Sequence, residues 1–201
     1  MIKPTHLSQS LGKAMSIINI RQKADFFAPL ALRLYLAPIM WMAGLNKFNH
    51  FDNTVQWFGN PDWGLGLPLP SLMTALVTTT ELACAVCLLL GLAIRWVTIP
   101  LFFTMLVAAI TVHWQNGWLA IAEPSGIFAN ERTLEATDKL AKAKQILQDY
   151  GNYEWLTESG SFVILNNGIE FATTYAIMLL TLFFIGGGRY VSVDYWVVKY
   201  H

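Results

Sequence analysis

Four long apolar runs constrain this chain more than any other feature of its sequence. Residues 26–45, 69–94 and 168–188 each contain one Lys, Arg, Asp or Glu, and residues 96–115 contain none. Each run has about the 20 residues that an α-helix needs to cross a hydrocarbon layer about 30 Å thick. None of them shows the polar stripe, at a period of 3.6 residues, that a helix on a soluble protein presents to water. We therefore predict an all-α, polytopic membrane protein, a bundle of four transmembrane helices.

The composition agrees with this prediction and excludes two other classes of protein. Only 13% of the 201 residues are charged, whereas about 25% is usual in soluble domains. The 13 basic residues are balanced by 13 acidic ones, so the surplus of cations that binds nucleic acid is missing. A chain that is 55% hydrophobic is not disordered, and its two cysteines cannot form a disulfide framework. We expect the lipid bilayer, and no nucleic acid, as a partner.

The distribution of positive charge predicts the orientation of the bundle. Residues 1–25 contain four Lys or Arg and one Asp, and Arg95, Arg189 and Lys199 follow the second and fourth runs on the same side. The long loop 117–167, on the other side, has seven acidic and four basic residues. Because Lys and Arg are concentrated in cytoplasmic segments, we expect both termini to be cytoplasmic. Residues 1–25 would form a cytoplasmic segment before a single membrane domain, residues 26–201.

Two segments between the predicted spans face the outside. Residues 46–68 are too polar to cross the membrane but rich in aromatic side chains, which predicts an interfacial helix or a half-buried loop. Residues 117–167 form a long periplasmic loop that contains one helix, with Asn130 as its N-cap and Glu131 and Glu135 near its start. This helix would cover its own bundle or dock a partner. Its predicted apolar face consists of Leu134, Leu140, Ala143, Leu147 and Tyr150.

Two ionisable residues occur inside the predicted spans. Arg33 lies about 10 Å, and Glu81 about 20 Å, from the cytoplasmic end of its own span, at a rise of about 1.5 Å per residue. Charges inside a membrane face the interior of the bundle and are paired. We therefore predict a buried Arg33–Glu81 ion pair, which would act as a structural clamp or as a site for a proton or a ligand.

Three further polar residues occur at the outer ends of three different spans. Lys47 follows the first span, His113 ends the third and Glu170 begins the fourth. If the three helices converge, these side chains form a catalytic cluster that exchanges protons with the head group of a quinone. The alternative is that each simply contacts water at a helix end.

The second span also contains two cysteines one helical turn apart, Cys84 and Cys87. Two thiols on one helix face can bind a soft metal ion such as Cu(I). Cysteine is equally at home as a small packing residue in a buried helix. The sequence leaves both interpretations open.

Several short motifs follow one another along the chain. They are Arg33, Gly44 with Lys47, Glu81 followed by Leu88-Leu89-Leu90-Gly91 and Arg95, Gly186-Gly187-Gly188-Arg189-Tyr190, and Ser192-Val193-Asp194. In their order and spacing they resemble the DoxX family of small four-helix bacterial membrane proteins, which would place this chain in the bacterial inner membrane. The resemblance covers about 150 residues, and the insert 117–167 departs from the family pattern.

The resemblance implies a redox setting. The chain would be an accessory protein or subunit of a quinone-linked redox system that acts at the periplasmic face of the inner membrane, and so part of an oxidoreductase. Two alternatives remain. The chain could be a carrier, export or maturation factor for a small copper-binding product, or a structural anchor for a periplasmic or membrane partner. Quinone and copper are the candidate cofactors that these alternatives imply.

Overall fold

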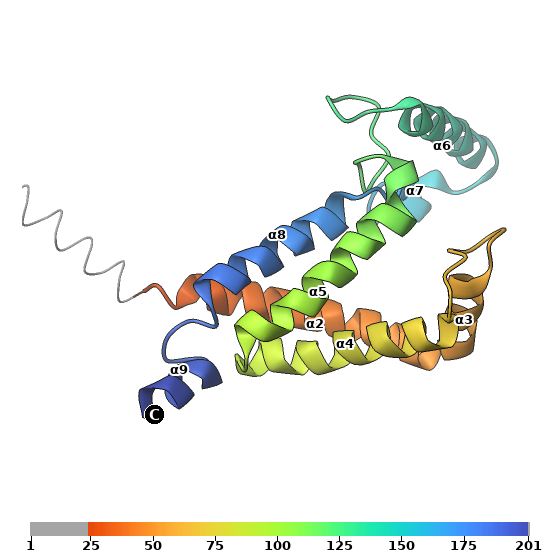
Figure 1. The fold of residues 1–201 in the computed structure, drawn as a ribbon. Coiled ribbons are helices and arrows are strands. Elements are labelled where there is room, and N and C mark those ends of the chain that lie inside the picture. The colour runs from red at the N-terminus through yellow and green to blue at the C-terminus, as the bar shows by residue number, and fades with distance from the viewer. Residues whose placement is uncertain (1–23, 201) are drawn as a thin grey trace, which may run out of the picture.

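The computed structural model describes residues 24–200, and it confirms the predicted all-α membrane bundle. Residues 1–23 of the predicted cytoplasmic segment lie outside this range. Apart from a single bridge between Ile121 and Leu165, the described chain consists of helices and loops (Figure 1). The helices are α2 (Phe27–Asn49), α3 (Phe51–Gly59), α4 (Pro70–Leu90), α5 (Ile94–Val107), α6 (Glu131–Tyr150), α7 (Tyr153–Thr157), α8 (Glu170–Ile185) and α9 (Val193–Tyr200).

Three helical segments are long and apolar enough to cross a membrane. They are Phe27–Asn49, Pro70–Leu90 and Ile94–Asn116, in which α5 continues through a π-helical turn and a short 3₁₀ turn. The fourth, α8, is equally apolar but has 16 residues, about 24 Å of helix. After α8 the chain is back at its starting end, because Arg189 lies 3.5 Å from Asp25. This return is what four crossings of the membrane produce.

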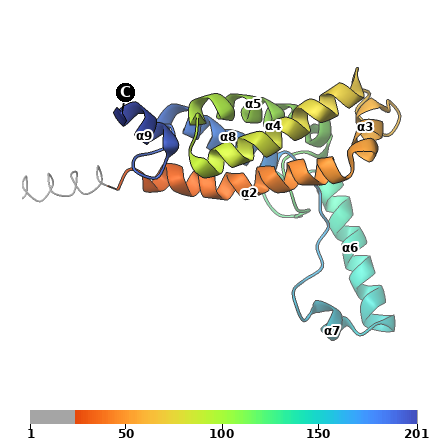
Figure 2. The same cartoon turned by 90° about the horizontal axis from the view of Figure 1, so that it is seen from below.

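Helix α2 packs along α4, and α5 packs along α8, so that the four helices enclose one core (Figures 1 and 2). The side chains at its centre are fully buried, whereas many large apolar side chains point outward, among them Met42, Trp96, Phe103 and Phe184. Soluble monomers rarely expose so much contiguous apolar surface, and a lipid-facing surface requires it. The core consists of Leu36, Met40, Leu88, Ile94, Leu101, Leu179 and Leu182, with smaller residues between them.

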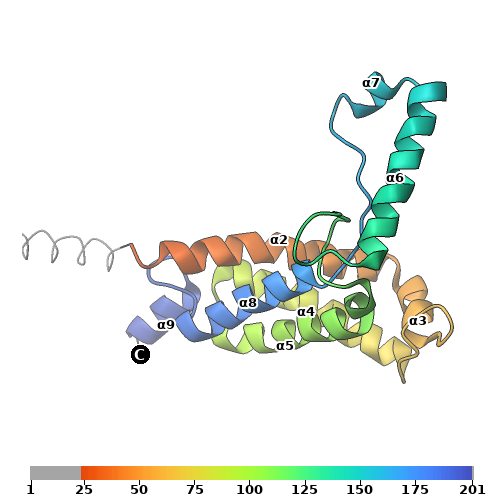
Figure 3. The same ribbon diagram turned by 90° about the horizontal axis from the view of Figure 1, so that it is seen from above.

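The two outer segments behave differently from one another. Helix α3 lies across the N-terminal end of α4, with Phe58 buried and Gly59 against Pro70. The insert instead projects away from the bundle (Figures 2 and 3). Its helix α6 begins with the predicted N-cap, since Asn130 and Thr133 form a reciprocal capping box. Because the insert projects away from the bundle, the prediction that this helix covers the bundle is wrong.

Candidate functional site

Lys47 and Glu81 form an ion pair between α2 and α4. The Lys47 ammonium lies 2.7 Å and 2.9 Å from the two carboxylate oxygens of Glu81 and also donates to the carbonyl of Ala43 at 3.4 Å. The Glu81 side chain is 2% exposed and that of Lys47 is 23% exposed. A carboxylate so deep in an apolar bundle is stabilised only by such a partner. The pair thus places a proton-accepting group inside the membrane helices, next to a cation that reaches outward.

Glycine at position 44 permits this arrangement. A Cβ atom at Gly44 would lie 2.9 Å from Cγ of Leu82 and 3.1 Å from Cβ of Glu81. The first contact is shorter than real Cβ contacts and the second is tighter than most of them, so a larger residue at position 44 would force the two helices to shift. Because Lys47 lies one helical turn beyond Gly44, it is placed directly over the Glu81 carboxylate.

Two buried hydroxyl groups share the helix face of Glu81. Thr74 and Thr78 precede it by seven and three residues, a spacing that puts all three on one side of α4. Both threonines are buried, and neither hydroxyl has a hydrogen-bond partner within residues 24–200. Leaving such a group unpaired costs about 1 to 3 kcal/mol, so the stripe is suited to water or a polar ligand.

Other membrane threonines differ from this pair. The hydroxyls of Thr98, Thr104 and Thr181 each donate to the carbonyl four residues earlier, at 2.8 to 2.9 Å. That bond is available to any threonine inside a helix. Thr74 and Thr78 do not make it, and their hydroxyls remain free to bond to something else.

An apolar groove of about 530 Å³ runs between the same two helices. Its nearest residue, Ala85, is one turn from Glu81 on α4. Apolar side chains line the groove, which suits a hydrocarbon chain better than a polar molecule. The lining residues are Leu34, Ala37, Pro38, Trp41, Met42, Ala85, Val86 and Leu89.

The predicted Arg33–Glu81 pair is wrong. The Arg33 guanidinium donates instead to four backbone carbonyls, those of Leu88 at 2.8 Å, Leu89 at 3.1 Å, Gly187 at 2.6 Å and Val191 at 3.2 Å. The reason is the register of the two antiparallel helices. Since α4 packs Glu81 against Gly44, the glutamate faces a point eleven residues along α2 from Arg33, about 16 Å away.

Arg33 and Asp194 together fix the tight turn between α4 and α5. Carbonyl groups at the end of a helix lack partners, and Arg33 supplies donors to two of them on α4. The Asp194 carboxylate accepts from the free N–H groups of Ala93 and Ile94, at 2.6 and 2.9 Å, at the start of α5. Gly91 has φ of +71°, and a Cβ there would lie 2.7 Å from the guanidinium carbon. Arg33, Gly91 and Asp194, which belong to separate motifs of the sequence, thus form one structural clamp around this turn.

Lys47, His113 and Glu170, which were predicted to form one cluster, bond to different partners. His113 Nδ1 lies 2.8 Å from the carbonyl of Asn167, and Glu170 accepts from the N–H of Ala120 at 2.9 Å. Within the described residues no hydrogen bond or ion pair joins any two members of the cluster. His113 and Glu170 instead hold the base of the insert, while Lys47 belongs with Glu81.

Among residues 24–200, no third metal-ligating side chain joins the two cysteines in a metal site. Cys84 is buried, Cys87 is partly exposed and neither is in a disulfide. In the part of the chain that the structure describes, no group of three or more His, Cys, Asp or Glu converges as a metal site would. The geometry gives no support to the copper hypothesis and leaves Cys84 as a packing residue of the core.

Sequence reasoning identified Lys47 and Glu81 but assigned them to different sites, and it missed Thr74 and Thr78. The signal for the threonines was present in their spacing from Glu81 along one helix face. The signal for the pair was the glycine one turn before Lys47, which marks a close approach of helices.

Comparison with known proteins relates the first three membrane helices to a family. Residues 28–114, from α2 to the end of the third span, match the model of the DoxX family. A protein of Bacillus subtilis (strain 168) named "Putative oxidoreductase CatD" is 33% identical over 94 residues, which is 47% of this chain and 66% of the relative. The match thus spans just under two thirds of that protein's length. No solved structure matches the chain. The resemblance expected from the sequence is confirmed over residues 28–114, which match the DoxX family model, while the tail motifs at residues 186–194 lie outside this match.

Proposed function

We propose that this chain is the membrane subunit of a redox system and that Lys47 and Glu81 exchange protons with a quinone. The observation that carries the proposal is a carboxylate buried among membrane helices whose partner is itself an ionisable group. Ionisable residues are costly inside a membrane and occur there mainly at proton and substrate sites. The name of the Bacillus relative, an oxidoreductase, supports the same class of function.

The surroundings of the pair suit a quinone. The free hydroxyls of Thr74 and Thr78 match the carbonyl or hydroxyl oxygens of such a head group. The apolar groove between α2 and α4 suits its hydrocarbon tail. A quinone supplies the exchange of two electrons and two protons, and the electrons pass to or from a partner redox protein.

The residues of this chain handle the protons. When a quinol is oxidised, the Glu81 carboxylate accepts its two hydroxyl protons one after the other, releasing the first before it takes the second, and the Lys47 ammonium stabilises the ionised carboxylate before and after each transfer. Glu81 then releases the proton along Thr78 and Thr74 toward the outer end of α4. Reduction of a quinone runs the same steps in reverse.

The test measures how tightly a short-chain quinone binds to the full-length protein in lipid nanodiscs. Quenching of tryptophan fluorescence reports the binding. Thr78→Val should weaken quinone binding about tenfold, the effect of one lost hydrogen bond of about 1.4 kcal/mol. Glu81→Gln should abolish the dependence of quinone binding on pH, because a glutamine side chain does not ionise. Thr98→Val is the matched control, because Thr98 is equally buried but its hydroxyl is already bonded. Equal binding by the wild type, Thr78→Val and Glu81→Gln would exclude this site.

We also propose that the site faces the periplasm of a bacterial inner membrane, with both termini cytoplasmic. The cations near the chain ends and the net negative insert support this orientation. A reporter that is active only in the periplasm should work when fused near Gln145 and fail when fused after His201. The reverse pattern would turn the bundle over and place the site on the cytoplasmic side.

A further inference from the structure

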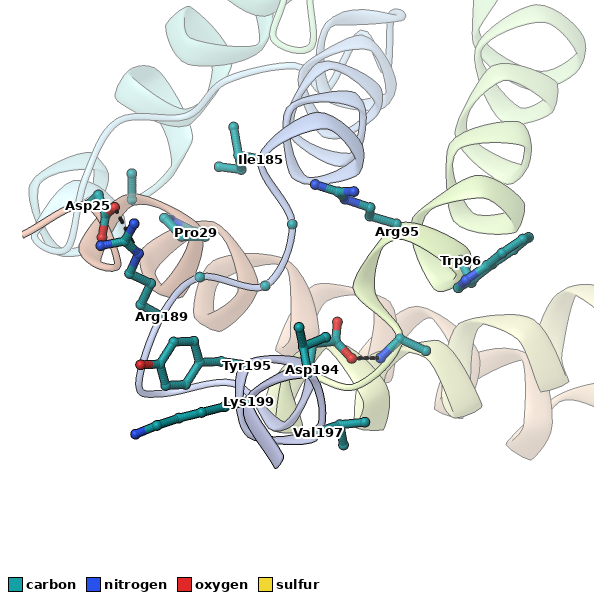
Figure 4. Close-up of a pocket in the computed structure, with 16 residues that line it drawn as sticks. Asp25, Pro29, Arg95, Trp96, Ile185, Arg189, Asp194, Tyr195, Val197 and Lys199 are labelled. Atoms are coloured by element: carbon teal, nitrogen blue, oxygen red, sulfur yellow. Dashed lines mark hydrogen bonds and ion pairs between the residues drawn. The ribbon is translucent and has the colours of Figure 1, made fainter. Parts of the chain in front are cut away.

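A cavity of about 880 Å³ lies at the end of the bundle opposite to the Lys47–Glu81 pair (Figure 4). The start of α2, the turn between α4 and α5, the glycine segment 186–188 and α9 enclose it. Its volume falls within the range of about 300 to 1,000 Å³ that is typical of small-molecule sites. The proposed proton site does not use it.

Three cations and two carboxylates line this cavity, and both carboxylates are already engaged. Asp194 accepts from the N–H groups at the start of α5, and Asp25 lies 3.5 Å from Arg189 (Figure 4). Within residues 24–200, no carboxylate lies within ion-pair distance of Arg95 or Lys199. The cavity therefore carries a net positive charge that an anion would neutralise.

The glycine segment allows one of these cations to reach the cavity. Gly186 has φ of +76°, which disfavours any side chain there, and its α-carbon lies under the Arg95 side chain. Arg95 makes only a long bond, 3.5 Å, to the carbonyl of Phe184. Lys199 lies over the ring of Trp196, 4.9 Å from its centre, which holds the ammonium without neutralising it. Both groups retain donors for a further partner.

The walls of the cavity are apolar, which distinguishes its ligand from a free inorganic anion. Ile185, Val197 and Val198 line it, and Trp96, at its rim, is 76% exposed. Trp96 lies in the first turn of α5, at the membrane end where lipid head groups are found. A ligand that fits both features has an anionic head and an apolar body.

We propose that this cavity binds the head group of an anionic phospholipid. The phosphate lies beside the Arg95 guanidinium, with Arg189 and Lys199 elsewhere on the lining of the cavity, and the glycerol and the start of the acyl chains lie against Ile185 and Trp96. Basic pockets beside membrane helices are suited to anionic lipids, with about 1 kcal/mol for each Lys or Arg near the surface. Bound there, the lipid would join α5, α8 and α9 into one unit.

The test titrates the full-length protein, in a non-ionic detergent, with short-chain phosphatidylglycerol, phosphatidylcholine of equal chain length and inorganic phosphate. Phosphatidylglycerol should bind at least tenfold more tightly than either of the others. The double variant Arg95→Gln/Lys199→Gln should lose about 25-fold, or about fivefold for each cation. Both side chains are exposed, so the variant should fold as the wild type does.

The control is Lys139→Gln/Lys142→Gln, which removes two exposed cations from α6 and should leave binding unchanged. Equal binding of phosphate and phosphatidylglycerol would overturn the assignment to a lipid. Equal binding of the two lipids would overturn the role of charge. An equal loss in the control would show that the total charge of the protein, and not this cavity, attracts the lipid.

Discussion

Two buried charges in the same pair of helices have opposite kinds of partner. Arg33 is surrounded by four backbone carbonyls, which never change their charge. Glu81 is bonded to Lys47, which can itself gain or lose a proton, and two unbonded hydroxyls share its helix face. The difference teaches that depth in the membrane does not make a charge functional. What matters is whether the surroundings can accommodate a second protonation state.

Arg33→Met should have the largest effect on stability. It removes the donor from two carbonyls at the end of α4 and from those of Gly187 and Val191 after α8, and because each buried unpaired group costs about 1 to 3 kcal/mol, we expect a loss of several such contributions in the free energy of unfolding. Arg33→Lys should restore little, because an ammonium lacks the planar fork that reaches four acceptors. Denaturant unfolding of the purified protein measures both. A small loss for Arg33→Met would end its interpretation as the structural clamp.

Lys47→Met should cause the next largest loss of stability, because it leaves the Glu81 carboxylate buried without a partner. The loss should be below the about 3 to 5 kcal/mol of a fully buried pair, since Lys47 is partly exposed. The double variant Lys47→Met/Glu81→Gln should be more stable than Lys47→Met alone. Additive losses in this cycle would mean that the two residues do not interact.

Asp194→Ala should cost about 1 kcal/mol, the usual value of a helix N-cap. The carboxylate bonds two N–H groups at the start of α5, so Asp194→Asn should retain part of this stability. Neither variant should change quinone binding at the other end of the bundle. If either variant did, the α4–α5 turn and the Lys47–Glu81 site would be coupled, and the structural and functional ends of the bundle would not be independent.

Thr78→Val should have the smallest effect on stability, and its sign is informative. The substitution removes a buried hydroxyl without a partner and leaves a methyl group of similar shape, so stability should stay equal or rise slightly. Thr98→Val, which breaks a hydrogen bond, should lower stability by about 0.5 to 1.5 kcal/mol. Thermal unfolding of the two variants measures this difference, and Thr78→Val should unfold at the higher temperature. A destabilised Thr78→Val would show that its hydroxyl is bonded in the apo protein.

The fold was predictable because hydropathy reports directly on the lipid environment. Even so, the run 26–45 ended too early, since α2 continues to Asn49. The polar residues Asn46 and Lys47 end the apolar run but not the helix, because Lys47 has a partner on α4. At the end of the second run, Gly91 with its positive φ ends α4 before the apolar residues end.

The partners of the charges were not predictable in the same way. Pairing depends on the register of two antiparallel helices, which hydropathy does not encode and the close approach at Gly44 determines. Depths estimated from the ends of the apolar runs therefore placed Arg33 and Glu81 closer together than they are in the structure. The tail motif Ser192-Val193-Asp194 was visible, but its role in capping a helix 100 residues earlier required the fold.

The base of the insert has a consequence for how the chain could have acquired it. The N–H of Ile169 bonds to the carbonyl of Gly117 at 3.0 Å, so the chain leaves and re-enters the bundle at one point. A turn of a few residues could join these positions, and loop-closure entropy changes only slowly with loop length. Exchanging the projecting arm for a short turn would thus leave the four membrane helices where they are. The arm is a removable module, which evolution could add, lengthen or delete without redesigning the bundle.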